Sequence, residues 1–278
     1  MRKKTLAVLF FFFAVALNAQ DLNVMTFNIR YNNRGDSANA WPYRKDNLAS
    51  QILFHKVQLL GVQEALHNQM VDLRERLPQF KSFGVGRDGG EKGEYSAIFY
   101  DTTRLQALAS ETFWLSETPG VVASKGWDAA LSRIVTWAKF KDRKTSKTFF
   151  AFNTHFDHMG RIARRESAKL LLQKVAEIAG KTPSVITGDF NAFPTDEPIQ
   201  VVMDKANPLH LTDSKEISST PHYGPTGTFN GFGPKEQKDV PIDYIFLKGD
   251  WKVKAHATLS QTWNGRFASD HFSVMAVL

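Results

Sequence analysis

Apolar stretches that run directly into polar residues recur along this chain, and they constrain its fold more than any other feature. The largely apolar stretch Pro183–Thr187 leads into Gly188–Asn191, and the last apolar stretch, Phe272–Leu278, follows Ser269–His271. Strands that are apolar throughout are typical of sheets covered on both faces. Polar groups at the ends of such strands converge on one rim of an α/β scaffold. The pattern therefore predicts packed sheets with a polar site along one edge.

The apolar patterns predict more strands than helices. Strands are expected at residues 21–29, 57–63, 94–100, 134–140, 148–153, 185–187, 241–247, 253–258 and 272–278. Helices are expected at residues 42–57, 67–77 and 161–179. Pro78 ends the second helix, and Gly180 suits the position just after the third. We therefore expect sheets packed together with helices outside.

The first residues have the pattern of a secretory signal peptide. A basic start, Arg2–Lys4, precedes an uninterrupted apolar run at residues 6–17 and a small residue at Ala19. A membrane anchor is the alternative, but a spanning helix needs about 20 apolar residues, and this run is shorter. We therefore expect cleavage near Ala19. Residues 20–278 then form one domain that is secreted or periplasmic and has no membrane span.

Composition limits how the mature domain is stabilised and what it binds. The chain has no cysteine, so disulfides and a thioether-linked lipid anchor are excluded, and one large apolar core must hold the domain together. The formal net charge is +7, and removal of Arg2, Lys3 and Lys4 with the leader leaves +4 (7 − 3). This modest charge weakens the case for a nucleic-acid-binding surface.

Polar residues at the expected strand ends have the chemistry of a metal-assisted phosphoester hydrolase. A hard cation such as Mg²⁺ binds carboxylate and amide oxygens, and imidazoles stabilise charge that develops on a phosphate. Single positions also allow simpler interpretations, because Asn28 suits a strand-end cap and Glu64 a solvated loop acid. The candidate residues are Asn28, Glu64, His155, Asp189, Asn191, Asp243, Asp270 and His271.

Six motifs occur in an order that resembles the endonuclease/exonuclease/phosphatase superfamily. The resemblance spans essentially the whole mature chain, and residues 154–158 with 163–164 resemble its secreted bacterial branch. It implies an α/β (α+β) four-layer sandwich of the deoxyribonuclease I-like type. In that fold two mixed β-sheets pack face to face between helices, with the active site along one edge. The motifs are residues 25–30, 63–64, 153–155, 188–191, 242–244 and 269–271.

The resemblance implies a metal centre and a group that activates water. Glu64 resembles the principal Mg²⁺ ligand, with Asn28 beside it and Asp270 as a further acidic contact, and Mn²⁺ is an alternative ion. Asp189 is expected to orient or deprotonate the attacking water. Asn191 is expected to hold the phosphate or that water through its amide.

The same resemblance implies two imidazoles, one on each side of the phosphate. His271 is expected to contact the scissile phosphate, with its ring oriented by Asp243. His155 is expected to have the matching role, oriented by Glu94, although the glycine-rich sequence before Glu94 also fits an ordinary surface loop. A carboxylate behind each ring would fix its tautomer and favour its protonated form.

The predicted function is a secreted, Mg²⁺-dependent phosphodiesterase that cleaves a small or single-stranded phosphoester and acts as a monomer. A phosphomonoesterase for sugar or inositol phosphates, a DNA endonuclease and a catalytically silent binding protein are the alternatives. Duplex DNA is disfavoured by the low mature charge, and a silent relative by the completeness of the motifs. The sequence leaves open whether Arg133, Asp157, His158 and Arg164 act in the site or only in the fold, and whether the loop aromatics Phe193, Phe232 and Trp263 contact substrate or core.

Overall fold

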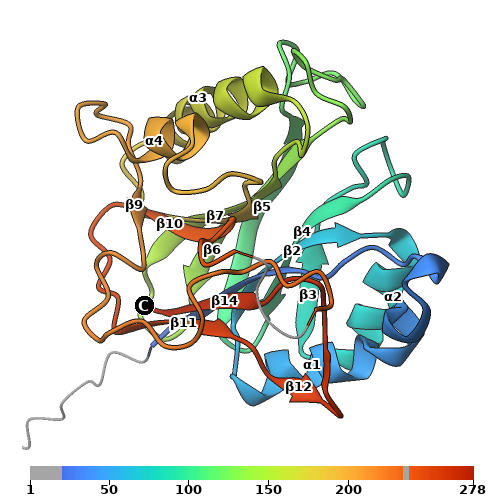
Figure 1. Cartoon of the computed structure of the whole chain (residues 1–278). Helices are drawn as coiled ribbons and strands as arrows, with labels where there is room; N and C mark the ends of the chain where they lie inside the picture. Colours follow the sequence, from blue (N-terminus) through green and yellow to red (C-terminus); the bar gives the residue numbers. More distant parts are fainter. Residues whose placement is uncertain (1–20, 234–237) are drawn as a thin grey trace, which may run out of the picture.

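A computed structural model of the chain describes residues 21–233 and 238–278, so the predicted leader lies outside the described residues. Two mixed sheets of six strands each lie face to face, with helices on the outer surfaces (Figure 1). The predicted four-layer α/β sandwich is confirmed. Within the described part of the chain, no helix combines the length and apolar character needed to cross a bilayer.

The first sheet has the strand order β11-β14-β1-β2-β4-β3. Its outer face is covered by α1 (Lys45–Phe54) and α2 (His67–Arg76), because Leu48 and Leu73 pack with Phe27 in one apolar cluster. β1 and β2 are parallel, and the other neighbours in the sheet are antiparallel. The strands are β1 (Asn23–Asn28), β2 (Leu59–Ala65), β3 (Phe80–Phe83), β4 (Tyr95–Asp101), β11 (Ala255–Leu259) and β14 (Ser273–Val277).

The second sheet has the order β5-β6-β7-β8-β10-β9. The long helix α3 (Arg161–Ala179) and the short α4 (Glu197–Met203) cover its outer face, where Leu171 and Ile199 pack with Phe246. A third apolar cluster, with residues from both sheets, fills the space between them. The strands are β5 (Leu105–Trp114), β6 (Ile134–Asp142), β7 (Thr148–His155), β8 (Ser184–Asp189), β9 (Thr212–Asp213) and β10 (Asp243–Lys248).

A buried polar network joins the two sheets beneath the polar rim. Gln63 on β2 donates to Asn153 Oδ1 on β7 at 2.6 Å, and Thr187 on β8 donates to the same oxygen at 3.0 Å. Gly61 makes this approach feasible, because a Cβ atom at that position would lie 2.1 Å from Thr187 Oγ1. These hydrogen bonds favour one arrangement of the two sheets, although Gln63 Oε1 itself has no partner among the described residues.

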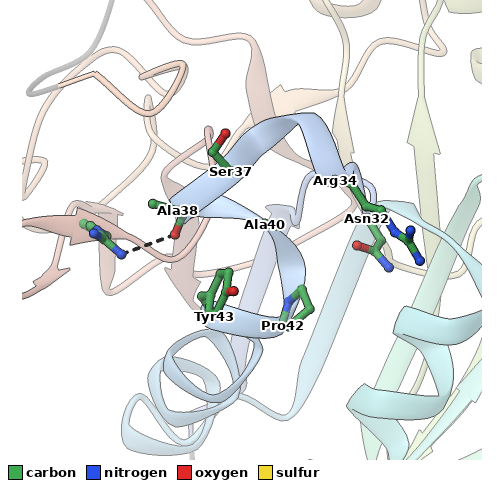
Figure 2. A pocket seen from close by; sticks show the side chains of 8 residues that line it. Asn32, Arg34, Ser37, Ala38, Ala40, Pro42 and Tyr43 are labelled. Carbon is green, nitrogen blue, oxygen red and sulfur yellow. Dashed lines mark hydrogen bonds between the residues drawn. The ribbon is translucent and has the colours of Figure 1, made fainter.

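Two short 3-10 helices and a small hairpin lie beside the first sheet. Helices η1 (Arg34–Asn39) and η2 (Trp41–Tyr43) follow β1, and the hairpin consists of β12 (Thr262–Trp263) and β13 (Arg266–Phe267). Between them is an open cavity of about 690 Å³ (Figure 2). Arg266 spans the gap by donating to the Ala38 carbonyl at 3.4 Å.

The structure differs from the predicted elements in a few places. α3 has the predicted bounds, but α1 begins at Lys45 because Pro42 belongs to the separate turn η2, and Val57 lies in the loop after α1. The sequence analysis missed β5, an edge strand that is exposed along most of its length and so lacks a clear apolar pattern. It also missed β3 and α4, which have only 4 and 7 residues.

Candidate active site

One row of site residues follows from the register of three neighbouring strands. Asp189, at the end of β8, is paired with His155 on β7 and with Asp243 on β10. Residues opposite each other in a ladder have close side chains when both point to the same side. The second sheet thus brings a carboxylate, an imidazole and a further carboxylate together at one edge.

A second row comes from the first sheet. Asn28 ends β1, and Glu64 lies near the end of β2 at a bulge, where its backbone has φ 65°. Asn28 Nδ2 donates to Glu64 Oε1 at 3.1 Å, and the backbone N–H of Tyr31 donates to Glu64 Oε2 at 3.1 Å. Asp270 and His271 lie just before β14, the other neighbour of β1.

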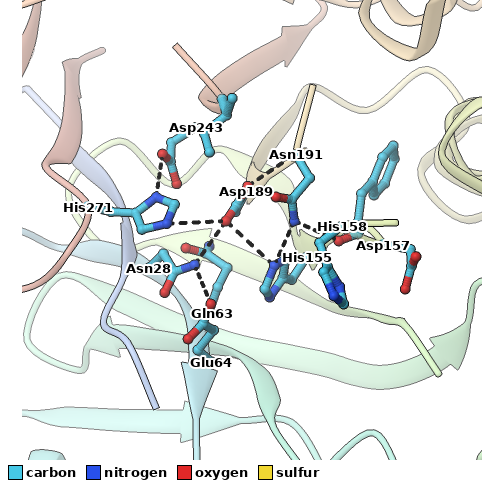
Figure 3. Close-up of polar contacts among 12 residues, drawn as sticks. Asn28, Gln63, Glu64, His155, Asp157, His158, Asp189, Asn191, Asp243 and His271 are labelled. Atoms are coloured by element: carbon cyan, nitrogen blue, oxygen red, sulfur yellow. Dashed lines mark hydrogen bonds and ion pairs between the residues drawn. The ribbon is translucent and has the colours of Figure 1, made fainter. Parts of the chain in front are cut away.

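Asp189 joins the two rows (Figure 3). Its Oδ2 atom accepts a hydrogen bond from Asn28 Nδ2 at 2.9 Å, and its Oδ1 atom accepts one from the Asn191 backbone at 2.9 Å. Burial, followed by the negative charge of Asp243, raises the pKa of Asp189 to about 7. A buried carboxyl group that titrates near neutral pH is suited to accept a proton from a reacting water.

His271 is an imidazole surrounded by acids. Its Nδ1 atom lies 2.9 Å from Asp243 Oδ2, and its Nε2 atom lies 3.8 Å from Asp189 Oδ2. Burial alone would lower the pKa of His271, but the charges of Asp243, Asp189 and Asp270 raise it well above the ordinary value. The ring is therefore positively charged, and its geometry agrees with the predicted pairing of His271 with Asp243.

His155 has a different environment, and here the structure corrects the sequence-based expectation. Burial, together with the nearby charge of Arg133, lowers the pKa of His155 well below the ordinary value, so the ring is neutral. Its Nδ1 atom is 3.9 Å from Glu94 Oε2, which is too long for a direct hydrogen bond. Its Nε2 atom lies 3.0 Å from the amide of Asn191. The expected orientation by a direct hydrogen bond to Glu94 and the expected protonated ring are therefore not found on this side.

Glu94 is bound by a neighbouring arginine. Arg87 Nη1 donates to Glu94 Oε2 at 2.8 Å, and both side chains are largely buried. Burial, followed by the charge of Glu64, raises the pKa of Glu94. Glu94 thus lies within the candidate site rather than on an ordinary surface loop.

The predicted ligands Glu64, Asn28 and Asp270 suit a hard divalent cation. Burial raises the pKa of Asp270, and the charge of Glu64 adds to that effect, so the two carboxylates are close enough to repel each other. Two acids in this situation gain from a cation between them, and all the available donors are oxygens, as Mg²⁺ prefers. Arg30 provides only partial compensation, at 3.7 Å from Asp270.

A second group of possible metal ligands overlaps the catalytic residues. Potential ligand atoms of Asp189, Asp243 and His271 all lie within 4.8 Å of one another. The Nδ1 atom of His271 is already bonded to Asp243, so a metal at this cluster would have to bind Nε2 and displace a proton from a ring whose pKa is raised. Both this trio and the Glu64 side thus offer ligands that could hold a metal ion.

Two residues that were not predicted from the sequence, Arg44 and Gln69, hold the backbone next to the site. Arg44 is buried, and its guanidinium donates to the carbonyls of Ile29, Arg30 and Ala268, which ties the end of β1 to the segment before Asp270. Gln69 on α2 donates to the Arg30 carbonyl at 2.9 Å. Only the burial of an arginine and a glutamine marks these roles, and burial is not visible in the sequence.

The four residues whose roles the sequence left open form a cluster next to His155. Asp157 accepts backbone hydrogen bonds from several residues, including Gly160 at 2.7 Å and Met159 at 3.0 Å. Arg164 Nη1 donates to the Asp157 carbonyl at 2.9 Å. Arg133 lies between Asp157, at 3.4 Å, and His158, at 3.0 Å. Asp157 and Arg164 therefore stabilise the loop after β7, and Arg133 provides positive charge beside His155.

The loop aromatics have defined neighbours. The guanidinium of Arg44 lies 5.7 Å from the ring centroid of Phe232, and Lys238 Nζ lies 4.6 Å from that of Phe193. Trp263 is partly buried and packs against the core cluster of the first sheet. The core interpretation is thus correct for Trp263.

Comparisons with known proteins agree with this fold. The model of the Endonuclease/Exonuclease/phosphatase family matches residues 25–271. An endonuclease/exonuclease/phosphatase from Bacteroides vulgatus is 42% identical with a TM-score of 0.88, covering 93% of this chain and 98% of that chain. A mannosyl-6-phosphatase from Bacteroides thetaiotaomicron is 38% identical with a TM-score of 0.87, covering 92% and 99%.

A more distant relative matches most of this chain in sequence. Protein angel from Drosophila melanogaster is 23% identical over 86% of this chain and 72% of its own length. The family match spans both rows of the site, from β1 to His271. This chain belongs to the endonuclease/exonuclease/phosphatase family.

Proposed function

We propose that this protein is a secreted, Mg²⁺-dependent phosphoesterase that hydrolyses a small phosphoester, with sugar phosphates as its leading substrate class. The observation that carries the proposal is the position of the Asp189 carboxylate, with its Oδ2 atom 3.5 Å from His155 Nε2 and 3.8 Å from His271 Nε2. A phosphate at this edge would meet a proton acceptor and a charged donor together.

Each residue has a distinct task in the proposed reaction. Asp189 accepts a proton from the attacking water, because its pKa of about 7 leaves it partly ionised at neutral pH. His271, charged and oriented by Asp243, donates a hydrogen bond to the phosphoryl oxygens, where negative charge accumulates. Asn191 orients the attacking water, which can donate a hydrogen bond to its amide oxygen, since both amide hydrogens are bonded to the Phe156 carbonyl and His155. A Mg²⁺ ion held by Glu64, Asn28 and Asp270 would neutralise phosphate charge when bound.

Two observations favour a sugar phosphate over the phosphodiester predicted from the sequence. A relative that is 38% identical over most of both chains is a mannosyl-6-phosphatase. The open cavity next to the site is lined by Tyr43, Arg34, Asn32 and Arg266, whose ring, amide and guanidinium groups suit a polyhydroxylated group. Arg30 links this cavity to the metal side, because it pairs with Asp36 on η1 at 3.1 Å and approaches Asp270.

A substrate panel tests this proposal. Mannose 6-phosphate, glucose 6-phosphate, p-nitrophenyl phosphate, bis-p-nitrophenyl phosphate and a single-stranded oligonucleotide would be compared with Mg²⁺, with Mn²⁺ and after treatment with EDTA. We expect metal-dependent release of phosphate, fastest from a sugar phosphate. Full turnover after metal removal would contradict the metal centre, and turnover of the diesters alone would restore the phosphodiesterase prediction.

Two variants of the cavity sharpen the substrate assignment. Arg34→Ala and Arg266→Ala remove guanidinium groups that form no ion pair with an acid among residues 21–233 and 238–278. We expect a higher KM for a sugar phosphate and an unchanged KM for p-nitrophenyl phosphate, whose ring has no hydroxyl groups for these guanidiniums to bind. Equal effects on both substrates would exclude a recognition role for the cavity.

A further inference from the structure

A second cavity adjoins the one to which the proposed function assigns a sugar. Its volume is about 370 Å³, and it lies between the start of α1 and the hairpin β12–β13. The two cavities share Ala38, Tyr43 and Arg266 in their walls. Arg266 donates to the Ala38 carbonyl at 3.4 Å where they meet, with Tyr43 beside this contact (Figure 2). The first and second cavities therefore form one continuous depression.

The second cavity is lined mainly by amide and aromatic groups. Asn39, Asn47 and Asn264 line it, and their side-chain amides form no hydrogen bond within residues 21–233 and 238–278. Trp263 and Phe267, both half-buried, add aromatic surface. An amide both donates and accepts hydrogen bonds, and so does a hydroxyl group. This combination of apolar rings and a few convergent polar groups suits a polyhydroxylated ring.

The charges around the second cavity favour an uncharged ligand. Among the described residues that line it, Arg44 and Arg266 are the only charged ones. Arg44 is buried, and its guanidinium already donates to four backbone carbonyl groups. Arg266 also borders the first cavity, where Arg34 adds a second positive charge. A phosphate is therefore better accommodated toward the first cavity, and a neutral sugar in the second.

Tyr43 lies where the two cavities meet. Its side chain is 71% exposed, and its hydroxyl group has no hydrogen-bond partner among the residues that the structure describes. A tyrosine combines an apolar ring face with a polar tip, so it can pack against a sugar ring and also bond a hydroxyl group. A ring at this junction can contact ligand groups in both cavities.

We propose that the second cavity binds an uncharged sugar that is linked by a glycosidic bond to the phosphorylated sugar in the first cavity. The preferred substrate is then a phosphorylated oligosaccharide rather than a free sugar phosphate. Tyr43 contacts both sugars, and Asn47 and Asn264 bind hydroxyl groups of the second one. This inference rests on the proposed function, because the first cavity must hold the sugar that carries the phosphate.

Two phosphorylated mannosides test the second cavity, since a relative is a mannosyl-6-phosphatase. One is methyl α-mannoside 6-phosphate, and the other is a mannose disaccharide with the 6-phosphate on its non-reducing sugar. With the whole mature protein and Mg²⁺, we expect kcat/KM to be about 3- to 10-fold higher for the disaccharide, the scale of one or two added hydrogen bonds. Equal values of kcat/KM for the two substrates would overturn the inference.

Two variants locate the source of this preference. Asn47→Ala removes an amide on α1, and Asn264→Gly removes one in the hairpin turn, where φ is 52° and glycine is tolerated without strain. Each variant should lower kcat/KM for the disaccharide toward the value for the methyl mannoside. Asn68→Ala, at an exposed asparagine on α2 outside both cavities, is the matched control and should keep the full preference. A preference that persists in both cavity variants would contradict the assignment.

Calorimetric titration separates failure of this inference from failure of the proposed function. If neither mannoside is hydrolysed, but the disaccharide binds more tightly and Asn47→Ala removes the difference, the proposed function fails and the sugar site in the second cavity stands. If both mannosides are hydrolysed with equal kcat/KM and bind with equal affinity, the proposed function stands and the second cavity is not a sugar site.

Discussion

The site contains two histidines, His271 and His155, whose pKa values are shifted in opposite directions. His271 contacts Asp243 at 2.9 Å and lies among acids, which raise its pKa, whereas His155 lies near Arg133 and Arg87, and burial together with their charges lowers its pKa. The carboxylate behind His155 is 3.9 Å away and already paired with Arg87. A motif can therefore predict where an imidazole lies, whereas the charge of that imidazole depends on neighbours from other strands.

This asymmetry divides the work of the site. A charged His271 can donate to a phosphoryl oxygen, and the loss of such a donor typically costs on the order of 10²–10³-fold in rate. A neutral His155 accepts from the Asn191 amide and thereby orients it.

The largest difference is expected between His271→Ala and His155→Ala. His271→Ala should lower kcat by about 10² or more, because it removes a charged transition-state donor. His155→Ala should cost less, on the order of 10-fold, because it removes a group that positions Asn191. Steady-state kinetics on one substrate would measure both, with thermal unfolding as the folding control. Equal losses of kcat in the two variants would contradict the proposed difference in role between the two histidines.

Glu64→Gln tests whether the metal belongs to the first-sheet side of the site. The variant should bind Mg²⁺ at least about 10-fold more weakly, since an amide replaces a charged ligand. The Mg²⁺ concentration for half-maximal activity should rise in parallel, with kcat largely recovered at saturating metal. Calorimetric titration would measure binding directly. Unchanged Mg²⁺ affinity would indicate that the metal binds at Asp189, Asp243 and His271 instead.

A smaller effect, on stability, is expected at Asp157 next to His155. Backbone N–H donors at Gly160, Ala130 and Met159 outweigh the effect of burial and lower the pKa of Asp157 from about 3.8 to about 2. A depressed folded-state pKa stabilises the protein above the unfolded value, so this contribution should be lost as pH falls from about 4 to 2. Asp157→Asn should be less stable than wild type by about 1–3 kcal/mol at pH 7.

Urea unfolding at several pH values would measure this stability. The difference between wild type and Asp157→Asn should shrink below pH 4. Asp250→Asn, a change at an exposed acid, should leave the profile unchanged. A constant difference down to pH 2 would show that the carboxylate is not the stabilising group.

The strand ends were the part of this molecule that could be predicted best from its sequence. Apolar runs of β1, β2 and β8 stop at the rim, so Asn28, Glu64 and Asp189 were located from local pattern alone. The edge strand β5 was not predicted, because only its two ends are buried and its apolar pattern is therefore weak. Strand pairing brought the site together, and this pairing is a property of the whole fold.

The charge of His155 could not be predicted in the same way. It depends on Arg133, which directly precedes β6, and on Arg87, in the loop before β4. Neither arginine is close to His155 in the sequence. The distance between Glu94 and His155 also depends on how the two sheets pack together, because Glu94 precedes a strand of the first sheet and His155 ends a strand of the second. Such distances are set by packing and not by motif spacing.

Asp189→Asn removes the proposed proton acceptor of the phosphoester hydrolase, so its turnover tests the proposed role of Asp189. The measurement is kcat of this variant at saturating Mg²⁺ on the best substrate of the panel, with phosphate binding followed by calorimetry. We expect kcat to fall by about 10² or more while phosphate binding and thermal stability remain close to wild type, because an amide cannot accept the proton. Near-normal turnover by a folded Asp189→Asn variant would contradict the account.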